Sequence, residues 1–361
     1  MIRKLLALLT LVVFLSSCSP KNPPTTESPS PVLKSTQVPT PTPAPLEPTL
    51  TAEVAGVLGR AVNFGNMLEA PAEGDWGLFV KEEYFDLVKE AGFQTIRFPV
   101  RFSAYTGSAP DYKLSPAILT RVDWAVENAT RRGLNIIIDV HHFDEMVGLT
   151  KNPELKVQLL SIWQQLAEHY QDQPASVYFE ICNEPNNIPA PAWNEVLRDA
   201  LSVIRTTNPD RWVVVGGVDW NSFYTLESLE LPASDDHLIA TFHYYSPFEF
   251  THQGAEWAAG SNDWLGTKWS GTEEEKAAIL RDFSVARAWS EKTGIPVFLG
   301  EFGAYSKGDM PSRVAWTQFI ARTAESMNFS WAYWELAAGF GIYDPVNSSW
   351  RTDLLHALIP E

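Results

Sequence analysis

Two glutamates that lie far apart in the chain each come at the end of a short apolar stretch, where a carboxylate can act as acid, base or nucleophile. Residues 177–182 read Val-Tyr-Phe-Glu-Ile-Cys, a buried strand that breaks off at the Asn-Glu-Pro run of residues 183–185. Residues 296–303 form a second such strand, which delivers Glu301. Barrel enzymes carry their catalytic groups at the carboxyl ends of strands. We therefore expect the fold to bring Glu184 and Glu301 face to face.

The elements that must position these glutamates alternate between strand and helix along the chain. We predict strands at residues 60–64, 95–99, 136–141, 177–182, 212–216, 238–243, 297–301 and 331–334. Amphipathic helices are predicted at residues 80–91, 116–132, 153–170, 191–206, 272–292 and 311–326, with only a short helix within 221–229. This alternation indicates a parallel sheet closed by crossover helices. The predicted fold class is α/β, a single (β/α)8 TIM barrel.

The N-terminal region reads as an export signal followed by a tether. Residues 1–18 combine a basic start, an apolar run at 5–15 and Cys18 after small residues, which resembles a bacterial lipobox; an ordinary secretory peptide is the alternative. Residues 19–50 are rich in Pro, Thr and Ser and predict a disordered linker. Residues 51–361 remain for the barrel. We expect an exported protein, extracellular or anchored at the cell surface through a lipid on Cys18.

The chain is acidic, with a formal net charge of −17 and a pI near 4.8. Because it has no basic run, we expect no nucleic-acid partner and no membrane contact other than the lipid anchor. The charge suits a neutral partner such as a polysaccharide. Cys182 is the one cysteine within residues 51–361, so that domain has no internal disulfide. We also expect the protein to be a monomer.

Other predicted strands also end in residues suited to binding and catalysis. They are Asn66, Arg97, His141, His142, Asn183, His243, Tyr245, Trp334 and Glu335. Such a set at one rim is typical of a carbohydrate site, because sugars offer hydroxyl groups to polar partners and apolar ring faces to Trp and Tyr. His141 and His142 suggest a metal, but consecutive residues of a strand point to opposite faces. We expect no metal ion and no cofactor.

In this order along the chain, the set resembles glycoside hydrolase family 5, within the clan of retaining (β/α)8 glycosidases. Residues 59–71, Gly-Arg-Ala-Val-Asn-Phe-Gly-Asn-Met-Leu-Glu-Ala-Pro, and 251–257, Thr-His-Gln-Gly-Ala-Glu-Trp, resemble the thermophilic-type bacterial endo-β-1,4-glucanases of that family. Some of those enzymes also cut mannans. The resemblance covers the chain from about residue 58 to its C-terminus.

The resemblance implies that Glu184 is the acid/base and Glu301 the nucleophile. It implies that Asn183 binds the sugar 2-hydroxyl, and that Arg97 and Tyr245 hold Glu301 ionised and aimed. The remaining implied roles are orientation of the catalytic pair for His141 and His243, sugar contacts for Asn66 and His142, stacking for Trp334, and substrate choice for Glu69, His252, Trp257 and Glu335.

Two geometric expectations follow from the resemblance. The peptide bond between Trp334 and Glu335 should be cis, which turns the Trp ring into the cleft. The carboxyl groups of Glu184 and Glu301 should lie about 5–5.5 Å apart, the spacing of retaining glycosidases, and not the about 6.5–9.5 Å of inverting ones.

The leading functional hypothesis is a retaining endo-β-1,4-glucanase that forms a covalent glycosyl-enzyme intermediate. An endo-β-mannanase or a dual glucanase/mannanase is the nearest alternative, since one hydroxyl configuration separates the two substrates. A surface barrel that binds glycans without cutting them, and a metal-dependent hydrolase, are alternatives from other classes.

Overall fold

The computed structural model describes residues 57–141 and 152–360. The predicted signal segment with Cys18, the predicted linker and His142 lie outside these ranges. Among the residues described, no helix is both long and apolar enough to cross a membrane.

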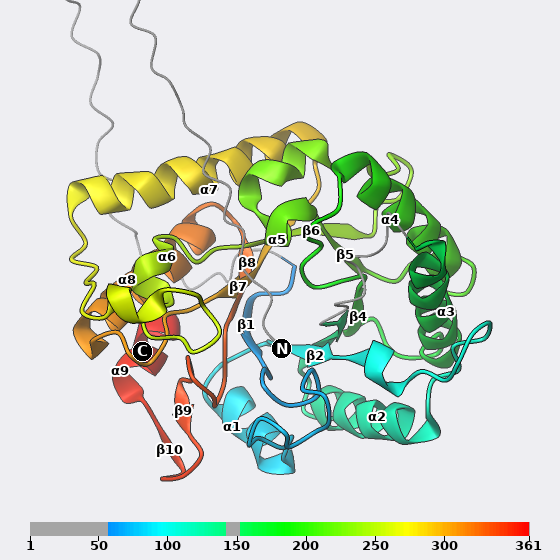
Figure 1. The fold of residues 1–361 in the computed structure, drawn as a ribbon, viewed down its shortest axis with the longest axis horizontal. Helices are drawn as coiled ribbons and strands as arrows, with labels where there is room; N and C mark the ends of the chain where they lie inside the picture. Colours follow the sequence, from blue (N-terminus) through cyan, green and yellow to red (C-terminus); the bar gives the residue numbers. More distant parts are fainter. Residues whose placement is uncertain (1–56, 142–151, 361) are drawn as a thin grey trace, which may run out of the picture. The chain divides into compact units, whose positions relative to one another are not determined.

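Parallel strands close into a barrel in the order in which they occur along the chain (Figure 1). They are β1 (Arg60–Asn63), β2 (Thr95–Val100), β3 (Asn135–Val140), β4 (Val177–Glu180), β5 (Val213–Gly216), β6 (Leu238–His243), β7 (Val297–Phe302) and β8 (Ser330–Tyr333). The sheet closes where β8 pairs with β1, with Trp331 opposite Arg60. The predicted (β/α)8 barrel is therefore confirmed, and each strand overlaps its predicted range.

Long helices form a ring outside the strands (Figure 1). They are α1 (Glu82–Glu90), α2 (Pro116–Thr130), α3 (Pro153–His169), α4 (Ala190–Arg205), α7 (Glu273–Thr293) and α8 (Met310–Ser326). After β5 come only α5 (Val218–Asn221) and the 3-10 helix η3 (Phe223–Ser228), as the weak pattern there predicted. The shorter elements are η1 (Phe102–Tyr105), α6 (Phe248–Thr251), η4 (Ser261–Trp264), the hairpin of β9 (Tyr343–Asp344) and β10 (Ser349–Trp350), and α9 (Thr352–Leu358).

Local chemistry sets the helix ends. Thr272 and Glu275 form a capping box at the start of α7, in which each side chain accepts from the other's backbone N–H. Gly294 ends the same helix with φ of 75°, a left-handed conformation that favours glycine. Ser115 accepts from the N–H of Ile118 at the start of α2. These caps fix the start of α2 and both ends of α7.

The barrel interior changes character along its axis. Its apolar part is a buried cluster of Leu58, Ala61, Ile137, Tyr178, Val214, Ile239, Phe298 and Ala332. Toward the carboxyl ends of the strands the buried side chains become polar or charged: Asn63, Arg97, Asp139, Glu180 and Thr241 are each 0% exposed. Buried charges require partners. These buried polar and charged side chains therefore lie beneath any site at the carboxyl ends of the strands.

A bulge between β6 and β7 aligns the residues that carry the chemistry. Phe242 pairs with Leu299, but His243 pairs with Glu301, so Gly300 is an extra residue in β7. A Cβ at Gly300 would lie 2.9 Å from Nε2 of His243, which explains the glycine. The bulge places Glu301 beside His243.

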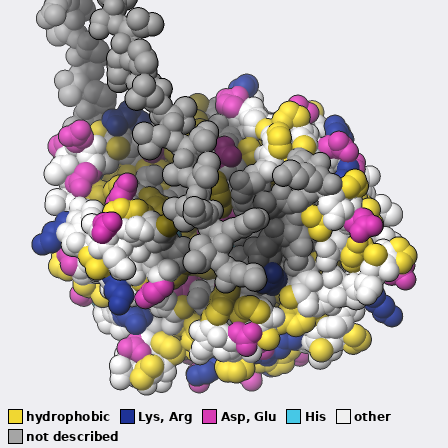
Figure 2. Space-filling model, viewed as in Figure 1, with side chains coloured by type: hydrophobic (Ala, Val, Ile, Leu, Met, Phe, Trp, Pro, Cys, Tyr) yellow, Lys and Arg dark blue, Asp and Glu magenta, His cyan; other side chains and the backbone are white. Residues whose placement is uncertain are grey.

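Charged side chains are mixed on the surface drawn in Figure 2. On this face, the described Lys and Arg side chains are scattered among Asp and Glu and form no continuous basic patch. This arrangement agrees with the acidic composition and offers no electrostatic footprint for a polyanion.

Candidate active site

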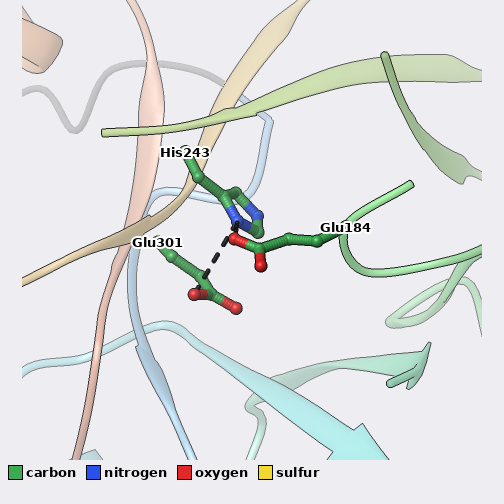
Figure 3. A group of neighbouring side chains, drawn as sticks. All are labelled: Glu184, His243 and Glu301. Atoms are coloured by element: carbon green, nitrogen blue, oxygen red, sulfur yellow. Dashed lines mark hydrogen bonds and ion pairs between the residues drawn. The ribbon is translucent and has the colours of Figure 1, made fainter. Parts of the chain in front are cut away.

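Glu184 and Glu301 approach each other at the carboxyl end of the barrel (Figure 3). One carboxylate oxygen of each, together with one ring nitrogen of His243, lie within 4.8 Å of one another. Glu184 follows β4 with 26% of its side chain exposed, whereas Glu301 on β7 is almost fully buried. An approach this close fits a retaining pair at about 5–5.5 Å better than an inverting pair at about 6.5–9.5 Å.

Both oxygens of Glu301 are held by donors. Nη1 of Arg97 donates to Oε1 at 2.8 Å, and the hydroxyl of Tyr245 donates to Oε2 at 2.9 Å. Arg97 is 0% exposed, so its charge acts in a poorly screened interior. The two contacts orient the carboxylate and favour its ionised form.

His243 links the two glutamates. Its Nδ1 lies 2.7 Å from Oε1 of Glu184 and 3.7 Å from Oε2 of Glu301. Burial lowers the pKa of His243 to about 4, so the ring is neutral at pH 7. A neutral imidazole orients Glu184 without holding it in the anionic form as a cation would, and Glu184 remains able to bind a proton.

The surroundings of the two carboxyls separate their roles. Burial raises the pKa of Glu184 to about 7 and that of Glu301 to about 7. The charge of Arg97 opposes this rise at both carboxyls, and at Glu301 His243 and the hydroxyl of Tyr245 oppose it as well. Two carboxyls so close retain one proton between them, and it is more stable on Glu184, which lacks a cation in direct contact among the residues described. These surroundings favour the proton on Glu184 and the negative charge on Glu301.

Arg97 also reaches Asn183, whose Oδ1 accepts from Nη2 at 2.7 Å. Three other partners of this arginine were not predicted from the sequence: Asn63, Asp139 and Glu180. All three are buried polar residues within otherwise apolar strands. That contrast is the signal that could have found them, because a charge in a core strand needs a partner.

His141 and Trp334 form one wall of the site. Their rings stack at 5.5 Å with 9° between their planes, and Nδ1 of His141 lies 2.6 Å from Oδ2 of Asp139. Trp334 is partly exposed, and the peptide bond between Trp334 and Glu335 is cis, as predicted. A Cβ at Gly65 would lie 2.9 Å from the Trp334 ring, so a glycine is required beneath it.

Glu69 and Glu335 lie below the surface. Both are 0% exposed and accept hydrogen bonds from backbone N–H groups of their own loops. Glu69 bonds to the N–H groups of Asn66 and Met67, and so holds the turn in which the partly exposed Asn66 adopts φ of 62°. Any effect of these two glutamates on substrate choice must therefore act through the loops they order.

His252 and Trp257 belong to an aromatic cluster beside Tyr245. His252 is 8% exposed and stacks on Phe248 at 4.0 Å with 16° between the ring planes. Trp257 is 62% exposed and meets Tyr305 edge to face at 5.0 Å. The structure therefore brings His252 next to Tyr245, and Trp257 exposes its ring on the outside of this cluster.

A sequence profile of the cellulase family, glycosyl hydrolase family 5, matches residues 59–339. The chain belongs to glycosyl hydrolase family 5. Endoglucanase H of Acetivibrio thermocellus is 36% identical over 313 residues, which cover 85% of this chain and 33% of that protein. Endoglucanase B of Clostridium cellulovorans is 28% identical over 80% of this chain and 70% of its own length. The chain spans about a third of the length of the first curated relatives it matches.

Solved family 5 structures are also similar. Thermotoga maritima Cel5A in complex with mannotriose superposes with a TM-score of 0.81 at 44% identity, covering 84% of this chain and 97% of the other. Structures of the same enzyme in complex with cellobiose give the same values. The family membership and barrel implied by the sequence resemblance are therefore confirmed.

Glu184, His243 and Glu301 also form the described group whose donor atoms are close enough to hold a metal ion (Figure 3). The donor set suits a cation poorly. Glu184 and His243 are already hydrogen-bonded to each other, and the guanidinium of Arg97, 2.8 Å from Glu301, would repel it. In a family 5 barrel the same atoms are better explained as an acid, its orienting imidazole and a nucleophile.

Trp220 is a surface aromatic that the sequence did not single out. It is 53% exposed and lies in a run, Asp219–Asn221, in which all three residues have positive φ. The run is tied to the loop of Glu184: the N–H of Trp220 donates to the carbonyl of Pro185, and the side chain of Asn221 to that of Asn183. Non-glycine residues in this conformation need local enforcement, which here comes from the bonds to Pro185 and Asn183.

Proposed function

We propose that this family 5 barrel is a retaining endo-β-1,4-glucanase. The observation that carries the proposal is the close pair of Glu184 and Glu301, with Arg97 and Tyr245 bonded to only one of them. The names of its relatives, Endoglucanase H and Endoglucanase B, support β-1,4-glucan as the substrate.

In the first step, a carboxylate oxygen of Glu301 attacks the anomeric carbon and the glycosidic C–O bond breaks. Glu184 donates its proton to the departing oxygen, and the anomeric carbon becomes esterified to Glu301. Asn183 is held by Arg97, and we expect it to bond the 2-hydroxyl of the sugar under attack, a contact that strengthens in the transition state.

In the second step, the carboxylate of Glu184 takes a proton from water, and the resulting hydroxide adds to the anomeric carbon as Glu301 leaves. Two displacements at the same carbon return the β configuration. The neutral ring of His243 contacts Glu184 in both steps, and we expect Trp334 to offer its face to the sugar ring.

Mannan is the second candidate substrate, because a similar enzyme, Thermotoga maritima Cel5A, has been solved with mannotriose and with cellobiose. Glucose and mannose units differ in the orientation of one hydroxyl. A site separates them strongly only where a polar group is committed to that hydroxyl. His252, Asn66 and the loops held by Glu69 and Glu335 are the groups we propose for that role.

The test is hydrolysis by the full chain of carboxymethyl-cellulose, mixed-linkage glucan, xylan and mannan, with product lengths followed over time. Early appearance of mixed oligosaccharides from the glucans, with β configuration at the new end, supports a retaining endo-glucanase. Equal rates on mannan indicate the dual enzyme. Tight glucan binding without any product would identify a non-catalytic glycan-binding barrel instead.

The proposal includes export and a lipid anchor on Cys18, as the N-terminal sequence predicts, and a monomeric barrel. A tethered enzyme can reach a polymer outside the cell. Native protein that partitions into detergent, and a Cys18→Ala variant that does not, would support the anchor. Wild-type protein recovered wholly in the aqueous phase would contradict it.

A further inference from the structure

Glu180 is a fully buried carboxylate on β4 that the proposed reaction does not use. It is 0% exposed, and both of its oxygens bond to Arg97. Nε of Arg97 donates to Oε2 at 2.7 Å and Nη2 donates to Oε1 at 2.8 Å. A bidentate pair of this kind fixes the plane of the guanidinium as well as its distance.

The remaining donors of Arg97 are committed by that orientation. Nη1 donates to Asn63 at 2.9 Å and to Glu301 at 2.8 Å, and Nη2 also donates to Asn183 at 2.7 Å. With the two bonds to Glu180, all five N–H groups of the guanidinium have acceptors. A change in the pairing between Arg97 and Glu180 therefore changes the geometry of the hydrogen bond from Arg97 to Glu301.

Charge gives Glu180 a second effect. One guanidinium contacts three carboxylates: Asp139 at 3.0 Å, Glu180 at 2.7 Å and Glu301 at 2.8 Å. Asp139 and Glu180 take no part in the proposed reaction, and their negative charges partly neutralise the positive charge of Arg97. That positive charge would otherwise act on Glu301 alone. The titratable groups that act directly on Glu301 are His243, Arg97, Glu184 and Tyr245. Asp139 and Glu180 contact Arg97, and His141 interacts with Arg97 and His243.

Resting on the proposed role of Glu301 as nucleophile, we propose that Glu180 is a positioning residue for the first chemical step. It holds the guanidinium of Arg97 against Glu301, and its own negative charge limits how strongly that guanidinium stabilises the Glu301 anion. Both effects matter because Glu301 loses its charge as it forms the ester. An anion held too tightly by Arg97 would be a weaker nucleophile.

The test compares full-length wild type with Glu180→Gln and Glu180→Asp on an aryl β-cellobioside, measuring kcat/KM across pH. Glu180→Gln removes the negative charge but keeps an amide oxygen as one acceptor for Arg97, so the guanidinium stays beside Glu301 with its positive charge less neutralised, and we expect the acid limb to move to lower pH by about one unit. We also expect kcat/KM at the optimum to fall by about 100-fold, because the bidentate pair that fixes the plane of the guanidinium is lost. Glu180→Asp keeps the negative charge, but its shorter side chain cannot meet Arg97 in the same way. We therefore expect kcat/KM to fall while the acid limb stays at its wild-type pH.

The matched control is Asp235→Asn. Asp235 forms the same kind of bidentate pair with Arg205, at 2.7 and 2.9 Å, between the end of α4 and the segment before β6. This variant should leave kcat/KM and the acid limb unchanged. An acid limb at the wild-type position in Glu180→Gln overturns the proposal, and so does wild-type kcat/KM in Glu180→Asp. If Glu180→Gln does not fold, Glu180→Asp decides: wild-type kcat/KM in that variant overturns the proposal.

Failure of the proposed function would be visible separately. A wild-type chain that cleaves no β-glucoside would refute the glucanase assignment. The carboxyl carbon of Glu301 can still be titrated by NMR in wild type and in Glu180→Gln, with Glu301→Gln used to assign the signal. Equal titration of Glu301 in both proteins then overturns the present inference without reference to activity.

Discussion

Arg97 and Glu301 meet through one hydrogen bond of 2.8 Å between Nη1 and Oε1, and both side chains are buried within the barrel. The cation comes from β2 and the anion from β7, so the bond spans the interior of the barrel. It leaves Glu184, the other carboxyl of the proposed catalytic pair, bonded to neutral His243. The difference in partners, more than the degree of burial, gives two glutamates at one site different chemistry.

The hydroxyl of Tyr245 is the second donor to Glu301, and its removal tests how the nucleophile is kept ionised. We expect Tyr245→Phe to shift the acid limb of kcat/KM to higher pH, because one stabilising bond to the anion is lost. A hydrogen bond to a charged group contributes about 1.5–3 kcal/mol, so kcat/KM should fall by about 10- to 100-fold. The measurement is a pH–rate profile on soluble glucan.

Tyr244 supplies the control for that experiment. Its hydroxyl donates to Asp282 at 2.8 Å, a carboxylate on α7. Tyr244→Phe should therefore leave the acid limb unmoved. The same shift in both variants would mean that packing of the β6 loop, and not the bond to Glu301, governs the profile.

The alkaline limb of the profile should belong to Glu184. Burial raises the pKa of Glu184 to about 7, and its protonated form is the one that assists the leaving group. On an aryl cellobioside with an activated leaving group, Glu184→Gln should retain measurable turnover and lose the alkaline limb, while the acid limb of Glu301 persists. An alkaline limb unchanged in this variant would assign it to another group.

The barrel could be predicted from the sequence because the strands are short apolar runs and several long helices begin with a proline or are followed by a glycine. The meeting of Glu184 and Glu301 could be predicted because strand ends converge on one rim in this fold. The partners of Arg97 depend on tertiary geometry and could not be predicted from the sequence. Asp139 and Glu180 lie inside predicted core strands, and nothing in the local pattern indicates that both face the same arginine.

The orientation of Glu69 and Glu335 could not be predicted from the sequence. The family resemblance implied that both shape substrate choice, and in the structure both side chains turn back to bond the N–H groups of their own loops. Trp220 could not be placed, because three consecutive residues with positive φ have no sequence signal without glycine. Loop conformation is the part of this site that periodicity does not reveal.

Glu69 makes a prediction about stability. Burial raises its pKa from an ordinary 4.5 to about 8. The folded chain therefore keeps this proton up to about pH 8, while the unfolded chain releases it near pH 4.5. Stability should fall as pH rises through that window. We expect the free energy of unfolding to drop by on the order of 2 kcal/mol between pH 6 and pH 9, measured by urea denaturation.

In Glu69→Gln, which cannot ionise, that drop should shrink, even if the variant is less stable at pH 6. Glu83, whose side chain is 61% exposed, is the control, and Glu83→Gln should keep the wild-type slope. A slope in Glu69→Gln as steep as in wild type would place the buried proton on a different carboxyl.

The two catalytic glutamates should respond differently to truncation and to azide. Glu301→Ala lacks the nucleophile and should lose turnover on every substrate. Azide that enters the vacated space would attack the anomeric carbon directly and give the α-glycosyl azide.

Glu184→Ala should lose most activity on natural glucans, whose leaving group needs a proton, and much less in the first step on activated aryl glycosides. The ester on Glu301 then accumulates, and azide attacks it from the β face to give the β-glycosyl azide. Proton NMR of the anomeric position separates the two products. Two results would contradict this assignment: an inverted hydrolysis product from wild type, or the α-glycosyl azide from Glu184→Ala. Either would mean that Glu301 is not the nucleophile and that water attacks the anomeric carbon in its place.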